Sequence, residues 1–258
     1  MRIATWNINS VRVRVGRLQA WLKAHQPDVL CLQEIKCTDD AFPLAEVEAC
    51  GYRAHVFGQK TYNGVALLTR ADAVDVVRGI PDGVNDSQSR FIAGTVNGVR
   101  IMGVYVPNGQ AVDSEAYHFK LEWYARLSAH LKGAIAKYPR LVVCGDFNVA
   151  PADIDVHDPK LFEGQTLCTD RERRALEGMA QAGGLVDVYR GLHPEPGRYS
   201  WWDYRALGFP KNHGLRIDHV WASPALASLC QASEVDREER KGIQPSDHAP
   251  VWADFATE

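Results

Sequence analysis

Six apolar, strand-like runs of this chain end or begin at a side chain that can bind a metal ion or move a proton. The residues at these points are Asn7, Asn9, Glu34, Tyr105, Asn108, Asp146, Asn148, Asp218, Asp247 and His248. A single Asp or Asn beside a strand usually forms a turn or caps a helix. Turn propensity does not account for a polar side chain of this kind next to each of six apolar runs. We therefore expect the strand ends to converge and to bring these polar side chains into one cluster.

The residue types in this set favour hydrolysis of a phosphodiester. Carboxylate and amide oxygens without thiolates suit Mg²⁺ or Mn²⁺, and Mg²⁺ commonly binds through one or two carboxylates together with substrate phosphates. A histidine beside an aspartate can be held cationic or act as a base, and a tyrosine hydroxyl can donate to a phosphate oxygen. Such a cluster can direct water onto phosphorus and stabilise the charge that builds on the oxygens.

Other common site signatures are absent from the sequence. There is no Walker A motif, no GxGxxG after a strand, no HExxH and no GxSxG, so nucleotide-binding folds, zinc proteases and serine hydrolases lack support. The six cysteines are scattered without a CxxC pair, which favours a reducing cytosol over a disulfide scaffold. The net charge of −3 argues against a non-specific coat on nucleic acid, but it is compatible with a local basic face around an acidic metal centre.

The elements that must position these residues are strands interspersed with a few helices. The strand-like runs are RIATWNI, DVLCLQEI, GVALLTR, RFIAGTV, VRIMGVYV, RLVVCGDF, IDHVWAS and APVWADF. Apolar stripes predict helices around residues 18–22 and 123–135, and a third over 171–182. Asn97 and Gly98 between two strands predict a hairpin. The pattern indicates an α/β fold whose sheets are at least partly antiparallel and covered by helices.

The bulk properties are those of a globular protein. The chain has 258 residues, of which 46% are hydrophobic and 24% charged. No linker, low-complexity tract or charge block divides it, so we expect one domain over residues 1–258. No apolar run reaches membrane-spanning length, and the N-terminal MRIATWNINS lacks the apolar core of a signal peptide. We expect a cytoplasmic protein with no membrane partner.

Seven ordered motifs resemble a known family. In chain order they are WNINSVRVR, LQEIKC, YNGVALLTR, GVYVPNG, GDFNVAP, GLRIDHVWAS and PSDHAPVW. Together they resemble the exonuclease III type AP endonucleases of the metal-dependent endonuclease/exonuclease/phosphatase superfamily, and the resemblance runs from Met1 to about Phe255. The broad superfamily pattern also fits DNase I-like nucleases and inositol or lipid phosphatases. The stretch RYSWWDYRALGFPKNHGLRIDH, together with YVPNG, is similar to the DNA-repair branch.

The resemblance implies a four-layered α/β sandwich, in which two mixed β-sheets pack face to face with helices outside and the site at one edge. It implies that Glu34 is the main Mg²⁺ ligand with Asn7 beside it, and Mn²⁺ is expected to substitute. Asp247 would lie near the metal, directly or through water. Asn9 stands where some relatives carry Asp, so its place among the metal ligands is open.

The resemblance also implies catalytic roles. Asp146 would orient or deprotonate the attacking water, and Asn148 would hold that water or a phosphate oxygen. His248, steadied by Asp218, would bind the scissile phosphate and stabilise its charge. Tyr105 would contact the same phosphate.

Further residues are expected to contact DNA. The matching segment of the repair branch lines a pocket for an extrahelical abasic sugar, whose extrusion costs less than that of a paired base. The candidates for the pocket and for phosphate contacts are Asn108, Asn212, Trp201, Arg90, Lys211 and Arg216. Arg216 could equally support the neighbouring strand, and Trp202 could belong to the core. His219 alternates to the opposite face of its strand, so we expect no role for it in the site.

The resemblance implies a repair enzyme that cuts the phosphodiester 5′ to an abasic site, removes 3′-blocking groups and acts as a 3′→5′ exonuclease on double-stranded DNA. The expected state is a monomer, associated with the nucleoid if the source is bacterial. The rivals are a small-molecule or lipid phosphatase and a catalytically silent nucleic-acid-binding protein. The segment WWDYR…NHGLRIDH argues against the first, and the complete polar set argues against the second. The balance of activities stays open, because it depends on how closely the loops 105–111 and 164–169 approach the DNA.

Overall fold

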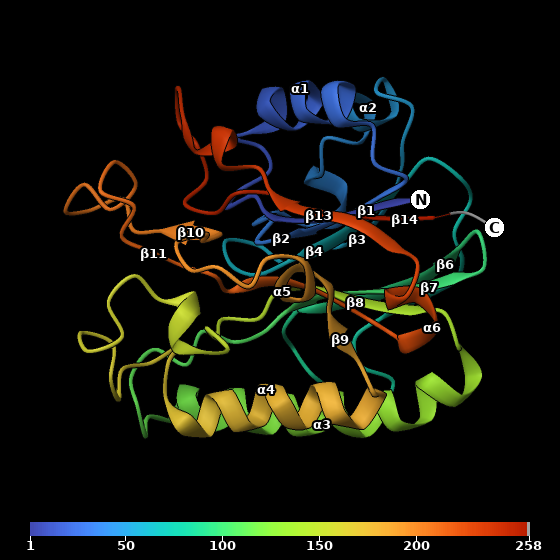
Figure 1. Ribbon diagram of the computed structural model, residues 1–258. Helices are drawn as coiled ribbons and strands as arrows, with labels where there is room; N and C mark the ends of the chain where they lie inside the picture. The colour runs from blue at the N-terminus through green and yellow to red at the C-terminus, as the bar shows by residue number, and fades with distance from the viewer. Residues whose placement is uncertain (257–258) are drawn as a thin grey trace.

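Two six-stranded β-sheets pack face to face in the computed structural model, which describes residues 1–256 (Figure 1). The first sheet contains, in spatial order, β13 (Cys230–Val235), β14 (Val251–Phe255), β1 (Arg2–Asn7), β2 (Val29–Gln33), β4 (Val65–Thr69) and β3 (Arg53–Phe57). The second contains β5 (Val74–Arg78), β6 (Phe91–Val96), β7 (Val99–Tyr105), β8 (Leu141–Asp146), β12 (Asp218–Ala222) and β9 (Val186–Asp187). A separate two-stranded ribbon is formed by β10 (Trp201–Trp202) and β11 (Gly214–Leu215).

Helices cover the outer faces of both sheets (Figure 1). One side carries α1 (Val15–His25) and α2 (Leu44–Glu48), and the other carries α3 (Glu115–Lys137) and α4 (Asp170–Gly183), which lie side by side. The remaining short elements are η1 (Asp39–Ala41), η2 (Asp153–Asp155), α5 (Val188–Leu192), α6 (Pro224–Ala227) and η3 (Arg237–Arg240). The result is the four-layered α/β sandwich with two mixed sheets that the sequence leads us to expect.

The helices bury the apolar stripes seen in the sequence. Trp21 and Leu22 of α1 belong to the apolar cluster on the outer face of the first sheet. Trp123, Leu127 and Leu131 of α3 belong to the cluster beneath the second sheet. All of these side chains are at most 1% exposed. Burial of one apolar face against a sheet is what holds each helix in place.

A third apolar cluster fills the space between the sheets. It includes Val29 and Cys31 of β2 and Val142 and Cys144 of β8, all with no exposed surface. Both cysteines are free, as are the others in the described residues. They act as small hydrophobes in the core, in agreement with the expectation of a fold without a disulfide scaffold.

The hairpin predicted at the Asn-Gly dipeptide is present. Asn97 and Gly98 connect β6 to β7 with φ angles of 50° and 77°. Two consecutive residues in the left-handed region are the requirement of a type I′ turn, whose twist matches that of the flanking strands.

The strand ends converge because each sheet contains one parallel pair. β1 is parallel to β2, so that Asn7 lies opposite Gln33, and β7 is parallel to β8, so that Tyr105 lies opposite Asp146. β12 runs antiparallel to β8 and begins at the same edge, where Asp218 pairs with Asp146. The polar residues at these strand ends are therefore delivered to one edge of the sandwich.

The position immediately before Asp146, residue 145, requires a glycine for a steric reason. Its φ is 156°, and a Cβ at this position would lie 1.9 Å from the carbonyl oxygen of Val104 in β7. Any side chain here would push β8 away from β7 and displace the carboxylate that follows.

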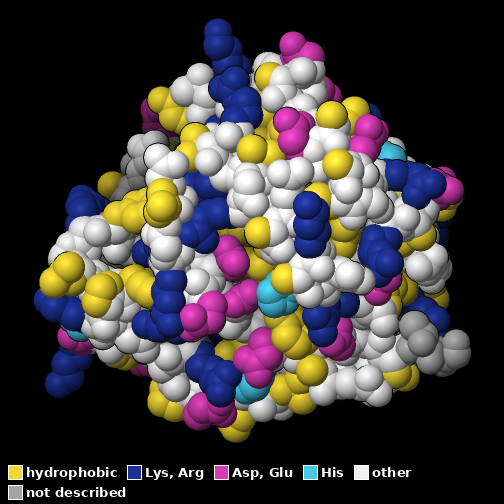
Figure 2. Space-filling model, turned by 90° about the horizontal axis from the view of Figure 1, so that it is seen from above, with side chains coloured by type: hydrophobic (Ala, Val, Ile, Leu, Met, Phe, Trp, Pro, Cys, Tyr) yellow, Lys and Arg dark blue, Asp and Glu magenta, His cyan; other side chains and the backbone are white. Residues whose placement is uncertain are grey.

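The outer face formed by α1 and α2 carries mixed charges. In Figure 2, which looks onto this layer from above, Lys and Arg side chains are interspersed with Asp and Glu. This face presents no single basic field that would attract a nucleic-acid backbone. Within the described residues, no helix combines the length and the apolar character needed to cross a bilayer.

Candidate active site

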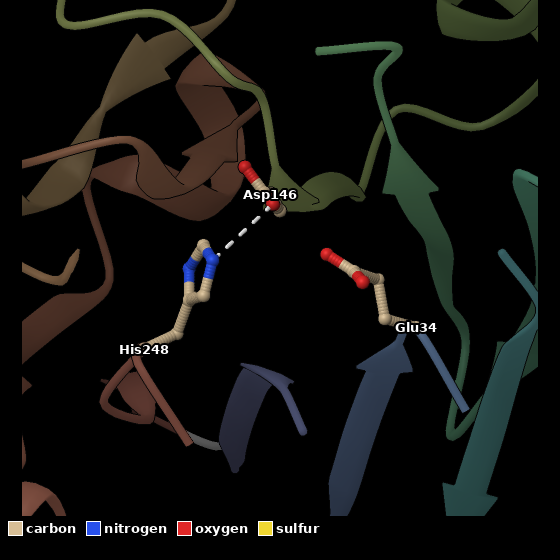
Figure 3. Close-up of side chains that lie close together, drawn as sticks. All are labelled: Glu34, Asp146 and His248. Atoms are coloured by element: carbon tan, nitrogen blue, oxygen red, sulfur yellow. Dashed lines mark ion pairs between the residues drawn. The ribbon is translucent and has the colours of Figure 1, made fainter. Parts of the chain in front are cut away.

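Three of the expected residues meet at this edge. Glu34 follows β2, Asp146 ends β8 and His248 precedes β14, and each offers a ligand atom within 4.8 Å of the others. Figure 3 shows the three side chains pointing toward one another from different elements. Asp146 and His248 are 1% and 4% exposed, whereas Glu34 is half-buried. The cluster is thus reached from solvent mainly at Glu34.

His248 lies between two carboxylates. Its Nδ1 donates to Asp218 Oδ2 over 2.9 Å, and its Nε2 lies 3.8 Å from Asp146 Oδ2. Burial disfavours the charged ring, but Asp218 and Asp146 outweigh it and raise the pKa of His248 to about 10. At neutral pH the ring is therefore a buried cation whose Nε2 faces the cluster.

The Asp146 carboxyl is buried as well, and its protonated form is favoured. Burial raises its pKa to about 7, and His248 only partly offsets this because Asp218 and Glu34 add negative charge nearby. Its Oδ2 accepts from Asn7 Nδ2 at 2.9 Å. A carboxylate with a pKa near neutrality can take up and release a proton, which is the property required of a general base.

Asn7 joins the two acidic residues of the cluster. Its Nδ2 donates to Glu34 Oε1 over 2.8 Å as well as to Asp146, and its Oδ1 accepts from the backbone N–H of Asn9 over 3.1 Å. In this arrangement the amide nitrogen of Asn7 faces the two carboxylates and orients them. Metal binding by Asn7 stays a prediction.

Asn9 and Asp247 belong to a chain of polar contacts beside the cluster. Lys36 Nζ donates to Asn9 Oδ1 over 2.7 Å, and Asn9 Nδ2 donates to Asp247 Oδ1 over 2.9 Å. Trp201 Nε1 donates to the other oxygen of Asp247 over 3.0 Å. Burial opposes the charge of Asp247, but His248 and these donors hold its pKa below the usual range. Asp247 thereby fixes the indole expected to line the pocket.

Lys36 is a site residue that the sequence reasoning missed. Its ammonium lies 2.9 Å from Glu34 Oε2. Burial works against ionisation of Glu34, but Lys36 and then Asn7 more than compensate and hold the pKa of Glu34 below its usual range. Only the short separation in LQEIKC hinted at this contact, because Glu34 and Lys36 lie after the end of β2 and both adopt left-handed φ angles, 48° and 53°, that strand alternation does not predict.

Tyr105 is held by Arg90. The Arg90 guanidinium lies over the Tyr105 ring at 4.6 Å, and its Nη1 donates to the Tyr105 carbonyl over 3.2 Å. Burial and the nearby Glu34 and Asp146 charges raise the pKa of Tyr105, so that its hydroxyl keeps its proton as a donor. Arg90, expected to contact phosphate, is 9% exposed and supports this ring.

Asn108 and Asn148 form a second amide pair at the site. Asn108 Nδ2 donates to Asn148 Oδ1 over 3.0 Å, and Asn148 Nδ2 donates to the Val106 carbonyl over 2.9 Å. Asn148 adopts a left-handed φ of 50°, and its backbone N–H donates to Asp146 Oδ1 over 2.9 Å. Asn148 is therefore tied to the carboxylate expected to act on water.

Arg216 is a correction to the expected DNA contacts. It is 1% exposed, its Nε donates to Asp155 Oδ1 over 2.6 Å, and its Nη2 donates to Asp187 Oδ2 over 2.7 Å. A guanidinium that is enclosed and paired in this way cannot reach a phosphate in solvent. The alternative reading, support of the neighbouring strand, is the one that its geometry favours.

The other expected residues divide between surface and interior. Lys211 is exposed, while Asn212 is engaged internally, accepting from Trp202 Nε1 over 3.1 Å and donating to the Gly197 carbonyl over 3.0 Å. Trp202 is fully buried and belongs to the core. His219 is also fully buried, and burial with the nearby Arg216 lowers its pKa to about 4. Its Nε2 lies 3.1 Å from the Arg216 carbonyl and its ring stacks on Phe147, and the absence of a role for it in the site stays a prediction.

Comparison with known proteins places the chain in a family. Residues 4–248 match the model of the Endonuclease/Exonuclease/phosphatase family. The chain belongs to this family. It is 36% identical to exodeoxyribonuclease III of Haemophilus influenzae over 266 residues, covering 99% of this chain and 100% of that protein. The expected relationship to exonuclease III type AP endonucleases and the expected class, a hydrolytic nuclease, are thereby confirmed.

Solved structures support the same relationship. The 3′ phosphatase NExo from Neisseria, solved with a product DNA hairpin, superposes with a TM-score of 0.97 at 42% identity, covering 100% of both chains. An AP endonuclease from Archaeoglobus fulgidus gives a TM-score of 0.96 at 37% identity, again covering 100% of both chains. The expected fold class is confirmed by these matches.

Proposed function

We propose that this protein is a Mg²⁺-dependent DNA-repair phosphodiesterase that acts as a monomer on double-stranded DNA. It cuts 5′ to abasic sites, removes phosphate and other blocking groups from 3′ ends, and acts as a 3′→5′ exonuclease. The observation that carries the proposal is the buried pair of Asp146, with a pKa of about 7, and His248, with a pKa of about 10, beside Glu34. This pair places a proton acceptor next to a fixed cation, as phosphodiester hydrolysis requires.

The donor set fits a magnesium ion. Glu34 and Asp146 provide hard carboxylate oxygens within 4.8 Å of each other, and no thiolate is among the ligand atoms of the cluster. Glu34 is the more exposed of the two and would be the main ligand. Asp247 would lie near the metal, directly or through water. When bound, Mg²⁺ supplies positive charge to the phosphate oxygens and to the leaving alkoxide. Mn²⁺, with similar ligand preferences, is expected to substitute.

The chain's own residues perform the remaining steps. The charged His248 Nε2 binds a non-bridging phosphate oxygen and offsets the negative charge that develops on it. Asp146 takes a proton from the attacking water, which Asn148 helps to hold. The protonated Tyr105 hydroxyl donates to a second phosphate oxygen. Asp218, at 2.9 Å from His248 Nδ1, keeps the ring charged and aimed.

Contacts to the rest of the DNA come from residues around the cluster. Trp201, fixed by Asp247, forms a wall for an extruded abasic sugar. Asn108 contacts phosphate beside Asn148, and the exposed Lys211 adds a backbone contact. Asn212 acts on the pocket through Trp202, to which it is bonded. The neighbour bound to a product DNA hairpin supports DNA as the substrate of this chain.

The test uses three duplexes in Mg²⁺: one with a single abasic analogue, one with a 3′-phosphate and one with a recessed plain 3′ end. We expect cleavage or phosphate release on these duplexes and its loss when EDTA removes the metal, with recovery on adding Mg²⁺. Parallel assays contain inositol phosphates and a lipid phosphate. Turnover of these small substrates with no action on any duplex would replace the proposal with a small-molecule phosphatase.

A further inference from the structure

A buried lysine lies behind the catalytic edge. Lys120 of α3 and Glu172 of α4 form an ion pair, and both side chains are completely buried. The same ammonium donates to the backbone carbonyl of Asn148 over 2.6 Å and to that of Asn108 over 3.1 Å. The three N–H groups of one ammonium thus bind acceptors in the Asn108 loop, the Asn148 loop and helix α4.

Stability alone does not explain such a pair. Removing two charges from water is costly, and apolar side chains of similar volume are often as stabilising as a buried ion pair or more so. The interface between α3 and α4 otherwise uses apolar residues such as Leu176 and Met179. A buried ammonium is useful where backbone oxygens must be held at fixed positions, because one cation can bind several of them at once.

The two carbonyls that Lys120 binds belong to the residues whose side-chain amides meet at the site. Asn108 Nδ2 donates to Asn148 Oδ1 over 3.0 Å, and the Asn148 N–H donates to Asp146 over 2.9 Å. Asn148 also carries a left-handed φ of 50°, which costs energy for a residue with a side chain. Lys120 holds this conformation through the Asn148 carbonyl, and its own side chain is fully buried and does not reach the surface.

Glu172 extends the connection to the loop 164–169. Its Oε1 accepts from the Leu167 N–H over 3.0 Å, and its Oε2 accepts from the Thr169 N–H and hydroxyl over 3.1 and 2.8 Å. Leu167 has a φ of 78°, and its carbonyl accepts from the Ala150 N–H over 2.8 Å. One ion pair therefore fixes this loop and the Asn148 turn relative to each other.

We propose that Lys120 and Glu172 are positioning residues for the reaction, because their ion pair sets the Asn108–Asn148 amide pair against Asp146. The inference rests on the proposed function, since it assigns a purpose to these residues within the same site. The pair binds the backbone behind the amides, so its loss shifts the reacting geometry at Asn108 and Asn148, whereas the contacts proposed for Trp201 and Lys211 stay in place. A displacement of about 1 Å at a reacting group costs roughly 100-fold in rate.

The test is a double variant, Lys120→Met/Glu172→Gln, which removes both charges together and leaves neither unpaired. Steady-state release of phosphate from a 3′-phosphate duplex is measured in Mg²⁺, with thermal unfolding followed in parallel. We expect kcat to fall about 10- to 100-fold while KM stays within about threefold of the wild-type value. Partial unfolding alone would also lower the apparent kcat at constant KM, so kcat is calculated per folded molecule from the folded fraction at the assay temperature.

Leu131→Ala is the matched control for stability. Leu131 lies on the same helix as Lys120, is fully buried, and contacts the apolar cluster at a distance from the catalytic loops. Its truncation lowers the unfolding temperature and leaves kcat of the folded enzyme unchanged. If the double variant turns over within about threefold of wild type, or matches Leu131→Ala at equal unfolding temperature, the positioning role is refuted.

Lys120→Gln/Glu172→Gln keeps the proposal testable if the first double variant does not fold, because it also leaves no buried charge unpaired. The amide at position 120 can still donate to one of the two carbonyls, so an intermediate kcat is expected, and a wild-type kcat would refute the role. Failure of the wild-type protein itself to act on the duplex would instead refute the proposed function. The two failures are therefore distinguished by the wild-type assay alone.

Discussion

Two clusters of buried charge lie next to the start of β12, and they differ in their balance of positive and negative charges. One contains Arg216 and Arg190 with Asp155 and Asp187, two cations against two acids. The other surrounds a single imidazolium with several carboxylates. Arg216 and Asp218, only two positions apart in the chain, belong to different clusters.

The contrast is clearest in one aspartate from each cluster. Asp155 and Asp146 are both 1% exposed. Burial opposes the charge of both, but the guanidinium of Arg216, bonded at 2.6 Å, holds the pKa of Asp155 below its usual range. The cation nearest to Asp146 is the imidazolium of His248 at 3.8 Å, its other donors are uncharged, and burial raises its pKa to about 7. A neutralised cluster stabilises the fold, whereas an acidic excess remains available for a cation and for protons.

The largest effect is expected from Asp146→Asn, which removes the proposed base and keeps the shape. Turnover of a 3′-phosphate duplex should fall about 10²- to 10⁴-fold, because proton transfer to a positioned group contributes that much. Binding of the duplex, measured by fluorescence anisotropy, should persist. Loss of binding together with turnover would show that Asp146 has a structural role and would remove the contrast with Asp155.

The matched change in the neutral cluster is Asp155→Asn. It removes the acid paired with Arg190 and one of the two acids paired with Arg216, and should destabilise the protein by about 3–5 kcal/mol. The unfolding temperature should drop by roughly 10 °C, as calorimetry can measure. The folded enzyme should retain kcat within about threefold of wild type at 25 °C. A loss of kcat comparable to that of Asp146→Asn would mean that both clusters serve catalysis.

The dependence of activity on pH probes the acidic cluster directly. The base must be deprotonated, so kcat/KM should rise as pH increases toward the Asp146 pKa of about 7, by about tenfold per pH unit below it. The imidazolium must be protonated, so activity should decline as pH passes about 10.

Asp218→Asn is the control for this profile. Asp218 makes the largest contribution that raises the pKa of His248, so its neutralisation should move the alkaline limb to lower pH. An alkaline limb that does not move would assign that limb to another group. A stopped assay over pH 5 to about 11 on the 3′-phosphate duplex separates the two limbs.

The smallest effect is expected from Lys36→Met. The Lys36 ammonium, 28% exposed and 2.9 Å from Glu34, competes with a divalent cation for the same carboxylate. Its removal should lower the Mg²⁺ concentration for half-maximal activity by about fivefold or less, the size of a partly exposed ion pair. An increased Mg²⁺ requirement would show instead that Lys36 helps to orient Glu34 for the metal.

Much of the site was predictable because its residues follow strands directly. The apolar runs ending at Asn7, Glu34 and Asp146 are local features, and parallel pairing brings such ends together without further information. The motifs predicted the family and the layers of the fold, and both are confirmed. The roles of individual residues, the use of Mg²⁺ and the balance of activities stay predictions.

The role of Arg216 could not be predicted from the sequence. Its position beside a catalytic strand fitted either a phosphate contact or a structural role. The decision lies with Asp155 and Asp187, which are 61 and 29 residues away in the chain and reach it only in the folded protein. The Lys120–Glu172 pair, separated by 52 residues, was overlooked for the same reason.

The sequence by itself determined the family, the alternation of strands and helices, and the polar residues that end the strands. These follow from residue type and spacing, which are properties of short segments. Only the tertiary structure decided which charges are neutralised and which are left in excess. That outcome depends on distances between segments remote in the chain, and in a buried site a carboxylate at 2.6 Å from a guanidinium behaves differently from one at 3.8 Å from an imidazolium.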